Sequence, residues 1–378
     1  MEYRTIYLNQ YSSKIELTRF AAADVEEAHA ILHVDANGEL FESQLRRLQL
    51  SLQTFMQELE MEGHKMVFMR YFLSDATNQA PLIEQTGGCT VSFIQQPPLD
   101  GSKVALWIYT QRGTDISTMN GSTVVTHNGY RHIWTMGLTN TSVDTSYMQT
   151  WKTMLSYIDT LKLFGATLRD NCLRTWFYVR DVDTQYGGLV KSRRECFTEQ
   201  GLTADTHYIA STGIGGTPAD PKAIIQMGCY ALTGFEPQQQ RYLYAPTHLN
   251  KTVEYGVTFE RATLMQYGDR NHIYISGTAS INNKGEVVHV GDVERQTLRM
   301  WENVEKLLEE GGMGFEDIMQ IIVYLRDCAD YQLVQRMFAE KFPDKPCVIT
   351  LAPVCRPTWL IEMECIAVKA SQSEYRNF

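Results

Sequence analysis

The chain has 378 residues, of which 44% are hydrophobic and 21% charged, and it carries a formal net charge of -10. This composition is typical of a globular protein, and the acidic balance argues against a nucleic-acid partner, which needs clustered Lys and Arg. The eight cysteines form no Cys-x-x-Cys pair, no signal peptide is evident, and no apolar run approaches the roughly 20 residues of a membrane span, so the sequence predicts a cytoplasmic protein with reduced thiols and no membrane partner.

The first structured segment begins with a β-rich run over residues 28–34 and continues into a helix. Apolar residues of this helix step by three and four positions, the spacing of a helix with one apolar face: Leu45, Leu48, Leu52, Phe55 and Leu59. A strand-like phrase, Tyr71-Phe72-Leu73-Ser74-Asp75, follows, and apolar runs at 89–94 and 104–109 complete the segment. The polar, turn-rich residues 111–122 predict a linker.

The second segment repeats this order. A β-rich run over residues 132–137 precedes a helix with apolar residues at Met148, Trp151, Leu155 and Ile158. The phrase returns as Phe177-Tyr178-Val179-Arg180-Asp181, and apolar runs follow at 208–214 and 223–232. Residues 234–252, which contain two prolines and a run of glutamines, predict a second linker.

The third segment follows the same plan. A β-rich run over residues 272–277 precedes a helix with apolar residues at Leu298, Trp301, Val304 and Leu308, which Gly311-Gly312 ends. The phrase appears again as Val323-Tyr324-Leu325-Arg326-Asp327, and apolar runs follow at 347–351 and 359–368.

The repetition predicts an α+β fold built from three similar modules. Each helix has only one apolar face, so each module is expected to cover one face of a sheet with its helices. We place the modules at residues 1–115, 120–235 and 253–370. Three copies of one unit in a chain favour a closed assembly, and differences between the copies indicate which one kept its chemistry.

The closing strands of the modules differ in their acidic residues. The third strand carries Glu362 and Glu364, the second has Gln226 and no acid, and the first has none over 104–109. Residues two apart on a strand share a face, and an acid in an apolar strand is expected to have a raised pKa, which suits a proton donor near neutral pH. The alternative is a carboxylate paired with a partner at a module interface.

Residues 272–370 resemble the YjgF/Rid superfamily, also known as translation-inhibitor or endoribonuclease L-PSP-like proteins. The resemblance rests on Ile275-Ser276-Gly277, on Val323-Tyr324-Leu325-Arg326-Asp327 and on the closing strand Ile361-Glu362-Met363-Glu364-Cys365-Ile366-Ala367-Val368. It implies bacillus chorismate mutase-like modules that assemble as an intramolecular pseudo-trimer, with ligand clefts between neighbouring modules. The chain would then be a monomer or a weak higher oligomer.

The chain is also similar to the long single-chain chorismatases of this superfamily. The similarity lies in Arg174-Thr175-Trp176, in Ala210-Ser211-Thr212-Gly213-Ile214-Gly215, and in Cys355, which stands seven residues before Glu362. It implies hydrolysis of the chorismate enol ether to pyruvate plus a dihydrodiol or a hydroxybenzoate. Glu362 would be the acid, and Cys355 a second catalytic group in the subgroup that makes a hydroxybenzoate. The alternative for Cys355 is a small buried filler.

A substrate with two carboxylates needs cations, preferably arginines that bind in a bidentate manner. Candidate substrate-binding residues are Arg174, Arg356, Lys345, Arg261, Tyr208, Ser211 and Gly277. Each cation has the alternative of a solvated surface residue, and the loop at Ser211 that of a plain turn. Lys345 stands where smaller Rid proteins have a substrate-binding arginine, and this departure puts simple imine deamination in doubt.

The sequence predicts neither a cofactor nor a metal, because the nine histidines show no ligand spacing. The expected partner is a small anionic substrate. Two other functions stay open beside chorismate hydrolysis: a Rid-type enamine/imine deaminase, and a non-catalytic protein that binds a small metabolite.

Overall fold

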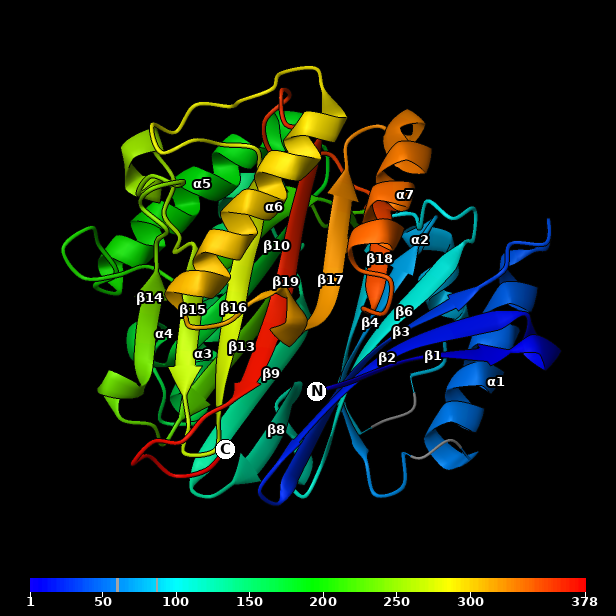
Figure 1. Ribbon diagram of the computed structural model, residues 1–378. Helices are drawn as coiled ribbons and strands as arrows, with labels where there is room; N and C mark the ends of the chain where they lie inside the picture. Colours follow the sequence, from blue (N-terminus) through cyan, green and yellow to red (C-terminus); the bar gives the residue numbers. More distant parts are fainter. Residues whose placement is uncertain (59–60, 86–87) are drawn as a thin grey trace.

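A computed structural model describes residues 1–58, 61–85 and 88–378, and these residues form three mixed β-sheets with helices on their outer sides (Figure 1). The first sheet, in spatial order, contains β1 (Glu2–Leu8), β2 (Ser13–Ala22), β3 (Val25–Val34), β6 (Val104–Arg112), β4 (Lys65–Leu73), β5 (Thr90–Gln95) and β12 (Thr217–Pro218). Its helices are α1 (Phe41–Glu58) and α2 (Ala76–Gln79).

The second and third sheets follow the same plan. The second contains, in spatial order, β11 (Ala210–Gly215), β10 (Cys172–Val179), β13 (Ile225–Thr233), β9 (Tyr130–Leu138), β8 (Ser122–His127) and β7 (Asp115–Met119), with helices α3 (Ser146–Leu163), α4 (Leu168–Asn171) and α5 (Val182–Glu199). The third contains β14 (Gln240–Leu243), β15 (Ala262–Gln266), β16 (Arg270–Ala279), β19 (Ile361–Ala370), β17 (Ile318–Leu325) and β18 (Cys347–Leu351), with α6 (Val293–Glu310) and α7 (Tyr331–Lys341).

Each sheet contains the same four-strand core, which confirms the predicted three-module α+β fold. The cores are β3-β6-β4-β5, β9-β13-β10-β11 and β16-β19-β17-β18. In each, the closing strand lies between two antiparallel neighbours, and the last two strands run parallel. A parallel pair requires a crossover connection, which α5 and α7 supply in the second and third modules and the much shorter α2 in the first.

The sequence located the helices correctly but not all of their buried faces. Leu155 and Leu298 are exposed, at 39% and 46%, whereas Met154 and Met300 are buried. Apolar residues spaced by three or four positions define a stripe on the helix, but this spacing does not determine which residues beside the stripe face the sheet. Leu59, which the sequence predicts in the apolar stripe of the first helix, lies outside the described residues.

The two segments predicted as linkers contain strands instead. Residues 111–122 include the end of β6 and all of β7, and residues 234–252 include β14. Both β7 and β14 lie at the edge of a sheet, where polar side chains face solvent while the backbone still pairs with one neighbour. Their composition therefore looks like that of a loop. The module boundaries themselves remain a prediction.

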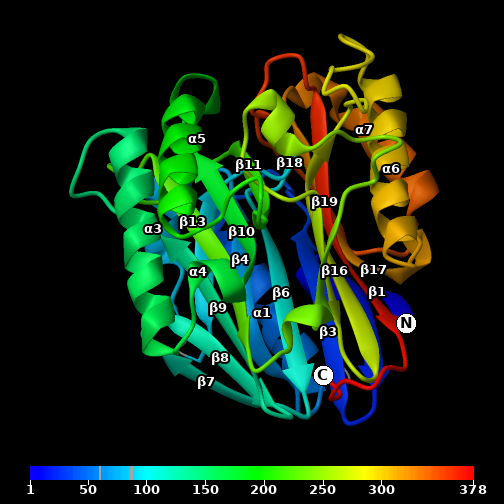
Figure 2. The same cartoon turned by 90° about the vertical axis from the view of Figure 1, so that its left-hand side faces the viewer.

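The three sheets turn their helix-free faces toward one shared interior (Figure 2). Aromatic side chains from different modules meet there: Phe68 lies 5.2 Å from Trp134, and Tyr230 lies 5.2 Å from Tyr274, between ring centroids. Among the described residues, none of the helices combines the length and the apolar character that crossing a membrane would require.

A buried carboxylate joins the three modules at this interior. Glu364 on β19 accepts hydrogen bonds from Arg174 Nη2 and Trp176 Nε1 of the second module, each at 2.8 Å. Arg70 of the first module brings its Nη1 to 3.8 Å from Glu364 Oε1. Arg70, Arg174 and Glu364 are each at most 1% exposed, so this ionic contact lies far from water. Removing one partner of such a buried pair leaves an uncompensated charge.

We predict that Glu364→Ala lowers the free energy of unfolding by about 3–5 kcal/mol, because Arg174 would keep its charge without a carboxylate. Chemical denaturation followed by circular dichroism measures the loss. Glu362→Gln is the matched control on the same strand face and is expected to change stability far less. A loss below about 1 kcal/mol for Glu364→Ala, which is the range of an exposed ion pair, would contradict this role.

Candidate active site

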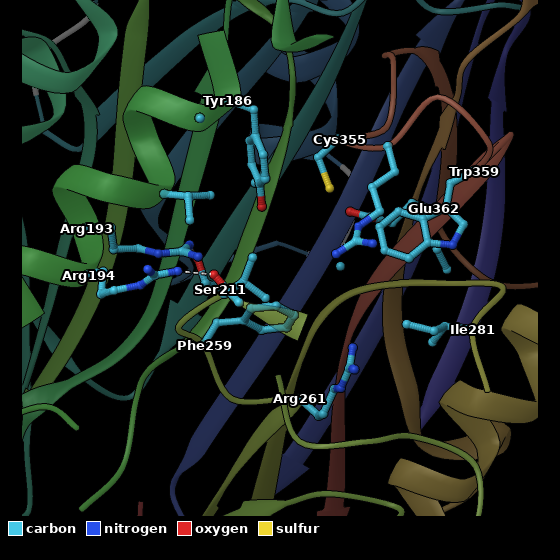
Figure 3. A pocket seen from close by; sticks show the side chains of 18 of the residues that line it. Tyr186, Arg193, Arg194, Ser211, Phe259, Arg261, Ile281, Cys355, Trp359 and Glu362 are labelled. Atoms are coloured by element: carbon cyan, nitrogen blue, oxygen red, sulfur yellow. Dashed lines mark hydrogen bonds between the residues drawn. The ribbon is translucent and has the colours of Figure 1, made fainter. Parts of the chain in front are cut away.

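A cavity of about 540 Å³ opens at the junction between the second and third modules (Figure 3). Helix α5 and strand β11 border it on one side, and β16, β19 and the loop before β19 on the other. Two hydrogen bonds hold the two sides together: Ser211 N donates to the side-chain Oγ of Ser276 at 2.8 Å, and Gly215 N donates to Pro353 O at 2.9 Å. The cavity therefore exists only because two modules meet.

Glu362 lies at the inner wall of this cavity. It extends from β19 opposite Ala279 of β16 and is 5% exposed. Gly277 makes room for it, because a Cβ at this position would collide with Glu362 Oε1. Burial and the negative charge of Glu364 raise the pKa of Glu362 to about 8, although Arg174 and Arg261 act in the opposite direction. The carboxyl is thus largely protonated near neutral pH.

The two glutamates of the closing strand have different surroundings, although they share a face. Glu364 faces the interior and is bound by Arg174 and Trp176, as described above. Glu362 instead lines the cavity. The alternative of a partnered carboxylate therefore applies to Glu364, whereas Glu362 remains the candidate acid.

Basic side chains dominate the charge of the cavity. Among its described lining residues, Glu362 is the only acid, and the cations are Lys191, Arg193, Arg194, Arg261 and Arg356. Several of these cations are held in place: Arg261 Nη2 donates to Asn250 Oδ1 at 3.0 Å, Arg193 Nη1 donates to Ser211 Oγ at 3.4 Å, and Arg356 lies 5.2 Å over the Trp359 ring. This charge favours the binding of a small anion.

Cys355 and Tyr186 direct their polar ends into the same part of the cavity (Figure 3). Burial and the charge of Glu362 raise the pKa of the Cys355 thiol to about 12, which a hydrogen bond with Tyr186 offsets only in part. Cys355 is consequently a neutral thiol near neutral pH. It can donate a hydrogen bond or occupy space, but it does not resemble an activated thiolate nucleophile.

Six of the residues proposed from the sequence meet at this cavity: Glu362, Cys355, Arg356, Arg261, Ser211 and Gly277. Arg174 lies behind it, bound to Glu364. Tyr208 packs against Phe197 in the core of the second module, with ring centroids 6.2 Å apart. Lys345 lines a different cavity, between the first and third modules. These three residues therefore do not form part of the candidate site.

Sequence reasoning missed the contribution of α5. Tyr186, Lys191, Arg193 and Arg194 all line the cavity. Tyr186, Val190, Arg193 and Arg194 follow helical spacing and so lie on one side of α5. The basic run Lys191-Ser192-Arg193-Arg194 was visible in the sequence, but such a run on a helix is usually a solvated face.

Comparisons with known proteins agree with this architecture. A family model described as endoribonuclease L-PSP matches residues 263–369. The 3-aminoacrylate deaminase RutC of Acinetobacter baylyi is 33% identical over 101 residues, which are 26% of this chain and 79% of the relative. A RutC family protein of Pyrococcus abyssi is 36% identical over 102 residues, which are 26% of this chain and 80% of that relative.

A solved structure covers nearly the whole chain. The crystal structure of a chorismatase aligns with a TM-score of 0.65 over 92% of this chain and 99% of its own, at 17% sequence identity. At this identity the likeness concerns the fold, which is again that of the three modules. The matches to single modules and the match to the full chain therefore describe the same architecture at two levels.

We predict that the carboxyl of Glu362 is half-protonated near pH 8 and that Glu364→Gln lowers this pKa. The substitution removes a neighbouring negative charge and leaves the charge of Arg174 uncompensated, and both changes favour the ionised form of Glu362. Infrared difference spectroscopy of the protonated carboxyl measures the titration, with Glu362→Gln assigning the band. If the band of protonated Glu362 in the unmodified protein is already lost when the pH has risen to 5, the prediction is refuted.

Proposed function

The chain belongs to the endoribonuclease L-PSP (YjgF/Rid) family, and we propose that its cavity between the second and third modules hydrolyses the enol ether of chorismate, with Glu362 as the proton donor. The observation that carries the proposal is a buried carboxyl with a pKa raised to about 8 among five basic side chains. Chorismate carries two carboxylates, which the cations would hold, and an enol ether, which a protonated carboxyl can activate.

The reaction follows from this arrangement. Glu362 transfers its proton to the terminal methylene carbon of the enol ether, which leaves a cation stabilised by the ether oxygen. Water adds to the cationic carbon and returns a proton to Glu362, and the resulting hemiketal breaks into pyruvate and a ring alcohol. Formation of pyruvate and the dihydrodiol consumes one water in this way. Arg261 and Arg356 would position the carboxylates, so that the methylene carbon lies against the carboxyl of Glu362.

The neutral thiol of Cys355 bears on which product is formed. The hydroxybenzoate route consumes no net water. The ring loses a hydroxyl group as water when it becomes aromatic, and this offsets the water that cleaves the ether. This route therefore needs a group that controls the ring substituents and the water beside them. Cys355 hydrogen-bonds with Tyr186 and lies within electrostatic reach of Glu362, and we propose that Cys355 governs this choice.

Enamine or imine deamination is the second candidate, because the relative RutC of Acinetobacter baylyi is named for deaminating 3-aminoacrylate. Protonating the carbon of an enamine makes the same demand on an acid as protonating an enol ether. Lys345, which the resemblance places at the position of a carboxylate-binding arginine, lies at another cavity, so it does not support deamination at the Glu362 cavity. Semicarbazone trapping of a 2-imino acid distinguishes the two. Binding of chorismate without turnover would favour a metabolite-binding protein instead.

We predict that the purified protein releases pyruvate from chorismate and that Glu362→Gln lowers kcat by about 10²–10⁴-fold, the usual contribution of a general acid. A lactate dehydrogenase-coupled assay measures the release. Glu374→Gln, at an exposed position near the C-terminus, is the control and is expected to keep full activity. Absence of pyruvate with the unmodified protein would refute the proposed substrate.

We predict that Cys355→Ala retains pyruvate release but changes the ratio of hydroxybenzoate to dihydrodiol, because the thiol next to Tyr186 is lost while Glu362 remains. Chromatography of the ring products measures the ratio. If the ratio is the same as in the unmodified protein, Cys355 only fills space.

A further inference from the structure

Strand register identifies equivalent residues of the three modules. The second residue of the repeated phrase pairs with the closing strand in every module: Tyr324 with Glu362, Tyr178 with Gln226, and Phe72 with Ala105. Two residues earlier, on the same face of each strand, the equivalent residues are Ile322, Trp176 and Arg70. The first module therefore places a cation in the shared interior where the other two modules have an uncharged side chain.

Arg70 is a buried cation whose hydrogen-bonding capacity is largely unused. It is 0% exposed, and its Cζ lies 4.8 Å and 4.9 Å from the ring centroids of Trp107 and Trp176. Its Nη2 donates to Met136 Sδ at 3.9 Å, and a thioether is a weak acceptor. Nε and Nη1 have no hydrogen-bond partner among the described residues. Glu364 Oε1, at 3.8 Å from Nη1, lies beyond hydrogen-bonding distance.

Two tyrosine hydroxyls near Arg70 also have no hydrogen-bond partner. Tyr178 of the second module and Tyr324 of the third are at most 1% exposed, and neither hydroxyl is paired with any residue that the structure describes. The Tyr178 ring centroid lies 5.3 Å from Arg70 Cζ, and Tyr324 is within electrostatic reach of both residues. Burial raises the pKa of both phenols, so they keep their protons and can donate. A buried donor without an acceptor is unfavourable.

The charge of this part of the interior is not balanced. The charged groups that act on Tyr178 and Tyr324 are Arg70, Arg174 and Glu364, so two guanidinium groups face one carboxylate. Arg174 donates to Glu364 at 2.8 Å, and of the two arginines Arg70 is the one without a hydrogen-bonded counter-ion. Glu362 is largely protonated near neutral pH and does not alter this balance. One excess positive charge away from water is costly, and a single monovalent anion would compensate it.

We propose that the shared interior contains a binding site for one halide-sized anion, held by Arg70, Tyr178 and Tyr324. The guanidinium supplies charge-assisted hydrogen bonds, and the two hydroxyls supply further donors. Each module contributes one of these residues, so the anion joins all three modules. The donors are shielded from solvent, so the anion is monatomic and becomes enclosed as the modules assemble. The site is separate from the Glu362 cavity, which none of the three residues lines.

Crystallography of the full chain refolded in sodium bromide tests the proposal, because bromide scatters anomalously and refolding lets it replace an enclosed anion. We expect an anomalous peak within hydrogen-bonding distance of Arg70, Tyr178 and Tyr324. The absence of a peak at this place, or a water molecule in its stead, would overturn the proposal.

Thermal unfolding measures what the anion contributes to stability. The full chain is refolded in sodium chloride or in sodium gluconate of equal ionic strength, since gluconate is too large to be enclosed. We expect a higher melting temperature in chloride, because a ligand that binds only the folded state stabilises it. Tyr178→Phe and Tyr324→Phe each remove one donor. Either change should raise the chloride concentration needed for half of the effect at least about tenfold.

Arg70→Met removes the buried charge and should abolish the difference between chloride and gluconate. Arg295→Met, at an exposed position of α6, is the matched control and should keep it. Circular dichroism establishes that each variant is folded, and the two tyrosine variants decide the outcome if Arg70→Met is not. Equal melting temperatures of the unmodified protein in the two salts would contradict the site, as would a difference that all three interior variants retain. Neither experiment contains chorismate, so both results are independent of the proposed activity.

Discussion

A buried ionic contact between Glu364 and Arg174 links the shared interior of the modules to the candidate active site. Glu364 comes from the third module, Arg174 and Trp176 from the second, and Arg70 of the first approaches the same carboxylate. The contact therefore joins all three modules at a place without water. The negative charge of Glu364 also opposes the ionisation of Glu362, which lies two residues away on β19. Assembly of the modules and the protonation of the candidate acid thus have a common physical cause.

This coupling explains why, among the described residues, the junction at Glu362 has the properties expected of an active site. Burial and a neighbouring negative charge raise the pKa of Glu362, and a cavity lies beside it. At the position of Glu362, the second module has Gln226, which donates to Ser92, and the first module has Ala105. α5 adds the cations at the Glu362 junction. The three copies therefore carry different residues at equivalent positions, and Glu362 is the acid among them.

The sequence was sufficient to predict the three modules and to select Glu362 as a candidate. Both inferences depend on short segments, namely the alternation along each strand and the residues of the closing strands. The sequence was insufficient wherever the order of neighbours in space mattered. Lys345 is on the same module as Glu362 but faces the first module, whereas Arg193 and Arg194 come from the second. The sequence predicts that Arg174 binds the substrate, but in the structure Arg174 pairs with Glu364. Local periodicity does not determine which faces of the modules meet in the tertiary structure.

The most direct test is the pH dependence of kcat/KM for pyruvate release, which reports pKa values of the free enzyme, compared between the unmodified protein and Glu364→Gln. A donor must be protonated, so the rate should fall as the pH rises through the pKa of Glu362. We expect this fall near pH 8 in the unmodified protein and at lower pH in Glu364→Gln, because the repelling charge is gone. A profile without this fall, or one that Glu364→Gln does not move, would contradict the account.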